Sequence, residues 1–259
     1  MKKLTLFVAL LAMAFTATIT MAKDWKKIRI GVEAAYPPFS WIEPDGTLTG
    51  FDIDIAKALG EAMGAEVELV VQDWDGMIPA LLAKKYDCII ASMSATDERK
   101  KKVAFSNKYY QTPAKFVAKK GTMTEITKET MKGKRVGVQR ATIHDRYLTD
   151  NYGDTVEIKR YATQDEAYLD LTAGRVDMLI ADSIALSDGF LKKPEGQNYE
   201  FVGPDMTDPK WFGEGAAVAL RKGDVELIEK FNKAIETIRA NGTYKKIQDK
   251  YFDFNIYGE

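Results

Sequence analysis

Short apolar runs alternate with amphipathic stretches through the first half of the chain. The runs at 28–32, 67–71 and 86–90 have the length of buried strands and are too short for typical helices. Between them, the stretches 51–59 and 74–82 place apolar residues at helical spacing. This alternation of strands and helices predicts a parallel sheet with crossover helices.

A second series of the same kind begins near residue 112. Its predicted strands are 114–121, 133–139, 156–160 and 176–180, and its predicted helices are 124–131, 141–145 and 165–173. Because the strand-like stretch 215–223 echoes 114–121, we expect these two strands to link two lobes. The terminal helices, 225–240 and 244–251, should then pack back on the first lobe. The predicted class is α/β, with lobe 1 formed by 23–111 plus 208–259 and lobe 2 by 112–207.

The first 22 residues have the pattern of a secretory signal peptide. Lysines at positions 2 and 3 precede the apolar stretch 4–15, which is too short to span a bilayer. Small residues stand at Thr20 and Ala22. We therefore expect cleavage after Ala22 and export to a periplasm, with an uncleaved anchor as the alternative. The single cysteine, Cys88, lies in an apolar run, so we expect a buried, inert thiol.

Composition argues against several classes of function. The chain has 259 residues, of which 46% are hydrophobic and 29% charged, as in ordinary globular proteins. Its formal net charge is −1 and its only strongly basic block is 99–102, so we expect no nucleic-acid partner. His144 is the only histidine, and with no cysteine cluster beside it we expect neither a metal site nor a cofactor.

The stretch 91–99 (ASMSATDER) carries candidate binding chemistry. It follows a predicted strand and opens a helix with Thr96 as the N-cap, and Ser92 and Ser94 point the same way on extended backbone. Arg99 opposes the helix dipole unless an anion lies nearby. Helix N–H groups, two hydroxyls and a guanidinium together suit a carboxylate. A solvated surface arginine is the alternative.

Other polar groups stand where predicted strands end. Glu33 follows the first strand, Asp182 follows 176–180, and the turn at 141–145 opens a helix after another strand. In open α/β sheets, ligands bind beyond the carboxyl ends of the strands. These residues are therefore candidates for the same site.

Six motifs together resemble one protein family. They are YPPF at 36–39, GFDIDIA at 50–56, WDGMIPAL at 74–81, SMSATDER at 92–99, LTAGRVD at 171–177 and YFDFNIYG at 251–258. In this order they resemble the periplasmic solute-binding proteins of ABC importers for polar amino acids, of the lysine/arginine/ornithine- and histidine-binding type. The resemblance covers the chain from about residue 28 to its end. It implies a two-lobed type II periplasmic-binding-protein fold, with mixed, mostly parallel sheets, two hinge strands and the ligand in the cleft. It also implies a monomer that closes on a free amino acid and delivers it to a membrane permease.

The resemblance places seven residues around the α-carboxylate and α-ammonium of the ligand. They are Ser92, Met93, Ser94, Arg99, Thr142, Ile143 and Asp182. Arg99 would clamp the carboxylate as a bidentate fork, with the backbone N–H groups of Ser94 and Ile143. The Ser92 carbonyl, the Ser94 hydroxyl and Asp182 would hold the ammonium. A helix N-cap is the alternative role for Asp182.

The same resemblance gives a side-chain pocket. Its residues are Glu33, Tyr36, Asp52, Trp74, Gln139 and His144. Carboxylates with aromatic walls suit a long cationic stem, and a planar guanidinium can stack on Trp74. We therefore expect arginine, with lysine, ornithine, histidine and opines as alternatives. Three positions depart from the family pattern: Ala91 replaces a serine, Trp74 a leucine or phenylalanine, and His144 a glutamine.

Rival functions have weaker support. Some proteins of this fold are dehydratases of cyclic acids, but no serine or cysteine is paired with His144 as a nucleophile and no metal-ligand spacing is present. We therefore expect no enzyme activity. A sensory module of a receptor kinase is also not expected, since no signalling domain follows Glu259. Partnership with a chemoreceptor is compatible with transport.

Overall fold

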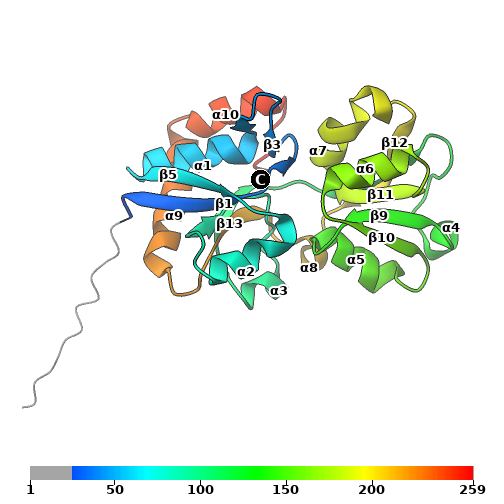
Figure 1. The fold of residues 1–259 in the computed structure, drawn as a ribbon, viewed down its shortest axis with the longest axis horizontal. Helices are drawn as coiled ribbons and strands as arrows, with labels where there is room; N and C mark the ends of the chain where they lie inside the picture. Colours follow the sequence, from blue (N-terminus) through cyan, green and yellow to red (C-terminus); the bar gives the residue numbers. More distant parts are fainter. Residues whose placement is uncertain (1–24, 259) are drawn as a thin grey trace, which may run out of the picture.

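The computed structural model describes residues 25–258 and shows two α/β lobes, each built around a five-stranded mixed sheet (Figure 1). The predicted signal peptide, 1–22, lies outside the described residues. Across residues 25–258, no helix is long and apolar enough to cross a membrane.

The sheet of lobe 1 has the strand order β5-β1-β6-β13-β7. Its strands are β1 (Lys27–Val32), β5 (Glu66–Val71), β6 (Cys88–Ile89), β7 (Ala104–Tyr110) and β13 (Ala216–Leu220). β1 pairs in parallel with β5 and β6, whereas β13 runs antiparallel to β6 and β7. One face is covered by α1 (Phe51–Ala62), α9 (Val225–Ala240) and α10 (Thr243–Tyr251). The other face carries η1 (Trp74–Gly76), α2 (Met77–Leu82) and α3 (Asp97–Lys100) (Figure 1).

Lobe 2 repeats this plan with the strand order β10-β9-β11-β8-β12. Its strands are β8 (Ala114–Lys119), β9 (Arg135–Gln139), β10 (Glu157–Tyr161), β11 (Met178–Asp182) and β12 (Tyr199–Met206). β9 is parallel to β10 and β11, and β8 is antiparallel to β11 and β12. Its helices are α4 (Lys128–Met131) and α5 (Ile143–Tyr152) on one face, and α6 (Gln164–Thr172), α7 (Ser183–Leu186), the π-helical turn η2 (Ser187–Leu191) and η3 (Pro194–Gly196) on the other.

The chain crosses between the lobes twice, at 111–113 and at 207–215. The second crossing contains α8 (Pro209–Phe212). The strands that we expected to link the lobes, 114–121 and 215–223, correspond to β8 and β13 and each lie within one sheet. Because each of them pairs with a strand on both sides, the linking residues are instead the ones just before them.

A small three-stranded sheet follows β1 in lobe 1. It consists of β2 (Ala35–Tyr36), β3 (Ser40–Ile42) and β4 (Leu48–Thr49), all antiparallel. It leads directly into α1 and holds the segment after Glu33 next to the cleft.

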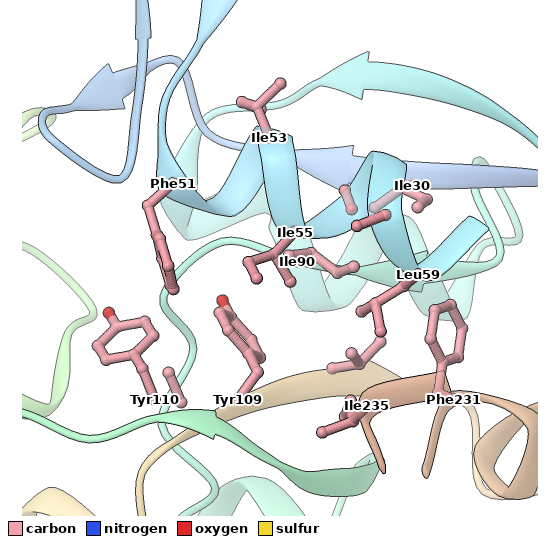
Figure 2. Close-up of a cluster of buried hydrophobic side chains, with 14 of the residues drawn as sticks. Ile30, Phe51, Ile53, Ile55, Leu59, Ile90, Tyr109, Tyr110, Phe231 and Ile235 are labelled. Atoms are coloured by element: carbon pink, nitrogen blue, oxygen red, sulfur yellow. The ribbon is translucent and has the colours of Figure 1, made fainter. Parts of the chain in front are cut away.

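Aromatic side chains fill the core of lobe 1 at the start of α1 (Figure 2). Phe51 is fully buried, and its ring centroid lies 6.0 Å from that of Tyr110 and 6.5 Å from that of Tyr109. The buried stripe continues along α1 to Leu59, which faces Phe231 of α9 (Figure 2). This packing fixes the end of β7, from which the chain enters the cleft.

A capping box begins α6, and its loss should be measurable. Thr163 Oγ1 accepts a hydrogen bond from the Glu166 N–H at 3.2 Å, and the Glu166 carboxylate accepts one from the Thr163 N–H at 3.3 Å. Thr163→Ala should lower the free energy of unfolding by about 1 kcal/mol, because helix N–H groups lose their partner. Urea denaturation measures this. Leu169→Ala, at a position 64% exposed on the same helix, should cost less than about 0.5 kcal/mol. Equal losses would contradict the capping role.

Candidate functional site

A cavity lies between the two lobes, where strands of both sheets end. Its volume is about 700 Å³, including the part open to solvent. Eleven of the thirteen predicted ligand-binding residues line it: Glu33, Tyr36, Trp74, Ser92, Ser94, Arg99, Gln139, Thr142, Ile143, His144 and Asp182. The strand ends that we expected to share one site therefore lie together around this cavity.

Arg99 forms the cationic part of the cavity. Thr96 Oγ1 accepts a hydrogen bond from the Arg99 N–H at 3.4 Å, which is the predicted N-cap of α3. The Arg99 Nη1 donates to the Ser94 carbonyl at 3.1 Å, and the guanidinium carbon lies 5.1 Å from the centroid of the Trp74 ring. Burial lowers the pKa of Arg99 to about 10, partly offset by Glu98, so the side chain is charged at neutral pH.

Glu33 forms an acidic part of the cavity. It is only 5% exposed, and its Oε1 accepts a hydrogen bond of 2.6 Å from Nε2 of Gln139 in the other lobe. Burial raises the pKa of Glu33 to about 7, although the Gln139 hydrogen bond opposes the rise. A cation brought beside this carboxyl would stabilise its charged form.

Asp182 is both a cavity residue and the N-cap of α7. Its Oδ1 accepts hydrogen bonds from the N–H groups of Ile184 at 2.8 Å and Ala185 at 3.2 Å. The Thr112 hydroxyl donates to its Oδ2. The alternative role as a helix cap is therefore observed, and it coexists with a place on the cavity wall. Burial raises the pKa of Asp182 to about 6, against the lowering effect of these hydrogen bonds.

Asp52 and Met93 do not line the cavity, which corrects their predicted place in the pocket. Asp52 is fully buried, and its two oxygens accept hydrogen bonds from Ser92 Oγ and Tyr109 OH, each at 2.9 Å. Met93 is 1% exposed and packs in the apolar cluster beneath α2. Its neighbours Ser92 and Ser94 both line the cavity. Ser92 has a φ of 53°, so the extended backbone expected at this point is not observed.

The start of α5 brings backbone N–H groups from lobe 2 toward Arg99. Thr142 is the N-cap, its Oγ1 accepting from the Asp145 N–H at 3.1 Å, and Ile143 and His144 line the cavity. Burial and the nearby charge of Arg99 lower the pKa of His144 to about 3, so this imidazole is neutral. A guanidinium from one lobe and a helix N-terminus from the other thus converge, as a carboxylate site requires.

The aromatic walls divide between the two ends of the cavity. Trp74 lies against Arg99, so one face of its ring already carries a guanidinium. Tyr36 lies near the acids, since burial and then the charges of Asp182 and Glu33 raise its pKa. Tyr36 is therefore the aromatic wall nearer the acidic part, a place that the stacking argument had given to Trp74.

Ion pairs join the lobes beside the cavity. Arg140 Nε lies 2.6 Å from Asp75 Oδ2, and Arg146 pairs with Glu98. In both pairs the arginine belongs to lobe 2 and the acid to lobe 1. Together with the Glu33–Gln139 hydrogen bond, they close the lobes around the cavity.

Sequence reasoning missed the cavity residues at the end of β7 and in the two crossings. They are Tyr110 at the end of β7, and Gln111, Thr112, Thr207, Phe212, Gly213 and Gly215 in the crossings. Only the position of these residues between two predicted lobes could have pointed to them. Which of them face inward depends on how the lobes are arranged.

Comparison with known proteins decides the family. The model of the bacterial extracellular solute-binding proteins, family 3, matches residues 28–254. The chain belongs to this family. An L-arginine-binding protein of Pseudomonas aeruginosa is 54% identical over 259 residues, covering 100% of this chain and 99% of that protein. A lysine/arginine/ornithine-binding periplasmic protein of Escherichia coli is 42% identical over 260 residues, covering all of both chains. The structure of an ancestral arginine-binding protein bound to arginine aligns with a TM-score of 0.80 at 39% identity, covering 88% of this chain and 98% of that one.

These matches confirm the predicted family and the two-lobed α/β fold of this solute-binding protein. The aligned ancestral structure is described as bound to arginine. The relatives are named as binding proteins for arginine, lysine, ornithine and histidine.

Proposed function

We propose that this protein captures a basic amino acid, arginine foremost, outside the cytoplasm and delivers it to the membrane permease of an ABC importer. It acts in the periplasm as a monomer after removal of its signal peptide. Lysine, ornithine and histidine are the next ligands in order. It carries out no chemistry on the ligand.

The observation that carries this proposal is the set of three ionisable groups that line one cavity. Arg99 supplies one positive charge, and Glu33 and Asp182 supply two negative charges. Free arginine bears the complementary set: one carboxylate, one ammonium and one guanidinium. An acidic or uncharged amino acid leaves at least one buried carboxylate without a counter-charge, which is costly in a desolvated site.

The contacts of each group support an arrangement of the set. Arg99 contacts the Ser94 carbonyl and the Trp74 ring, whereas Glu33 accepts a hydrogen bond from Gln139. The cation and this acid therefore have different neighbours in the cavity. A ligand with its carboxylate at Arg99 directs its side chain toward Glu33, along the ring of Tyr36.

Binding and closure follow from where these groups reside. Arg99 and Glu33 belong to lobe 1, and Ile143 and Asp182 to lobe 2. A ligand therefore gains both sets of contacts only when the lobes are closed. Closure in turn forms the pairs of Arg140 with Asp75 and of Arg146 with Glu98, so a permease can distinguish the loaded shape.

A thermal-shift panel tests the proposal directly. The mature protein is unfolded and refolded to remove bound ligand, then heated with each common amino acid, ornithine, citrulline and octopine. A ligand at about 100 times its Kd adds about 2.7 kcal/mol of stability, which raises Tm by several degrees. We expect arginine, lysine and ornithine to raise Tm and glutamate and leucine to leave it unchanged. A panel without any response would reject the binding role and reopen the dehydratase alternative.

A further inference from the structure

A closed ring of hydrogen bonds lies directly behind the cavity wall. Ser92 Oγ donates to Asp52 Oδ2 at 2.9 Å, and Tyr109 OH donates to Asp52 Oδ1 at 2.9 Å. The Ser92 N–H completes the ring by donating to Tyr109 OH at 3.1 Å. Asp52 and Tyr109 are fully buried, and of the three only Ser92 lines the cavity. The ring thus connects a buried carboxylate to a residue that a ligand can touch.

The ring holds Ser92 in an uncommon conformation. Its φ is 53°, in the left-handed region that costs a non-glycine residue about 1 kcal/mol or more. Both its N–H and its hydroxyl are held, so neither the backbone nor the side chain is free to relax to a common conformation. Such strain persists only where the surroundings fix it, and here Asp52 and Tyr109 do so.

The direction of one hydrogen bond decides what Ser92 can offer to a ligand. A serine hydroxyl has one hydrogen and two lone pairs. When Asp52 is ionised, that hydrogen is committed to its carboxylate. Ser92 Oγ can then only accept a hydrogen bond from the cavity side. It matches an N–H donor and repels a carbonyl oxygen.

A second carboxylate acts on the same place from the other lobe. The charge of Asp182 contributes to the raised pKa of Asp52, and both acids raise the pKa of Tyr110, which also lies beside Ser92. Ser92, which is bonded to Asp52 of lobe 1, and Asp182 of lobe 2 line the same cavity. A ligand ammonium placed there has a direct partner in Asp182 and an acceptor in Ser92.

We propose that Asp52 is a positioning residue which, with Tyr109, fixes Ser92 as a hydrogen-bond acceptor and thereby makes the site select α-amino acids over the corresponding α-keto acids. The proposal rests on the proposed function, because it concerns the ammonium end of the same ligand. Asp52 acts without touching the ligand. The earlier expectation of a direct contact is replaced by an effect carried through Ser92.

The test compares arginine with 5-guanidino-2-oxopentanoate, which differs only in carrying a keto group for the amine. Isothermal titration with refolded protein gives the ratio of the two Kd values. Asp52→Asn offers Ser92 an amide donor and frees its hydroxyl hydrogen. Ser92→Ala removes the hydroxyl acceptor and leaves the backbone carbonyl of residue 92 in place. We expect each variant to reduce the preference for arginine at least tenfold. The double variant, Asp52→Asn with Ser92→Ala, should lose no more of the preference for arginine than either single variant does, since both substitutions break the same interaction.

The control is Asp54→Asn, in the same turn of α1. The Asp54 carboxylate accepts from Lys250 Nζ and Tyr251 OH, both at 2.7 Å, on the outer side of the helix. This variant should keep the preference of the wild-type protein. If Asp52→Asn fails to fold, the preference for arginine is measured in Tyr109→Phe and Ser92→Ala instead. Tyr109→Phe removes the hydroxyl that bonds Asp52 and Ser92 without altering any charge.

Two results would overturn the inference: an unchanged preference in the folded ring variants, or additive losses in the double variant. Either leaves the proposed function standing. Failure of the wild-type protein to bind arginine or any other amino acid would be a failure of the proposed function itself, and it shows before any variant is compared.

Discussion

Arg99→Ala should weaken the binding of every amino acid ligand by about 3–5 kcal/mol, a factor of about 150 to about 5,000 in Kd. The α-carboxylate is common to all these ligands, and in the variant it enters a desolvated site without its counter-charge. Helix N–H groups at the start of α5 remain, but they supply only partial charge. Isothermal titration with arginine and lysine measures the loss, which should be equal for the two.

The fold should survive this substitution. Arg99 is half-buried as a whole residue, and its guanidinium contacts the Ser94 carbonyl and the Trp74 ring, both neutral. Without ligand, its burial is a cost, so the free energy of unfolding of the apo variant should not fall. Arg140→Ala is the matched control, since Arg140 pairs with Asp75 beside the cavity without lining it. We expect it to change Kd less than tenfold. If the Kd of Arg99→Ala for arginine lies within tenfold of the wild-type value, Arg99 does not bind the ligand α-carboxylate as predicted.

The parts of the site that could be predicted depend on local signals. The N-cap at Thr96, the strand before Glu33 and the helix start after Gln139 each follow from a few neighbouring residues. Strand ends in an α/β sheet share one edge, so correct local assignments were enough to bring these residues together. The family resemblance added the role of each residue.

The parts that were missed depend on distant contacts. β7 was not predicted because its sequence, AFSNKYY, lacks a regular alternation, and its pairing with β13 is interrupted by register shifts. Tyr110 and Thr112 reach the cavity only because the chain crosses between lobes there. The family resemblance placed Asp52 in the pocket itself. Its hydrogen bonds with Ser92 and Tyr109, distant in sequence, instead hold it behind the cavity wall.

Glu33→Gln should weaken arginine binding by about 2–5 kcal/mol while binding of citrulline changes far less. The glutamine keeps the size of the side chain and can still accept the hydrogen bond from Gln139. It removes the charge that opposes the ligand guanidinium, whereas the ureido group of citrulline needs no counter-charge. The ratio of the Kd for citrulline to the Kd for arginine, measured by titration, should fall about tenfold or more. An unchanged ratio would show that Glu33 does not recognise the side chain of the ligand.

The pH dependence of arginine binding is a second, independent test of the role of Glu33. In the closed structure without ligand, burial raises the pKa of Glu33 from 4.5 to about 7. Its contribution to the stability of the ligand-free fold is therefore fully present below pH 4.5 and lost as the pH rises through 7. A bound guanidinium favours the charged carboxylate, so arginine binding must release a proton and weaken as the pH falls below 7. We expect an affinity for arginine about tenfold lower at pH 5.5 than at pH 8.

Asp52 and Asp182, with pKa values raised to about 7 and about 6, add to the same dependence of affinity on pH. Glu33→Gln should therefore flatten the slope without removing it, and a variant with the full wild-type slope would show that another carboxyl carries the linkage.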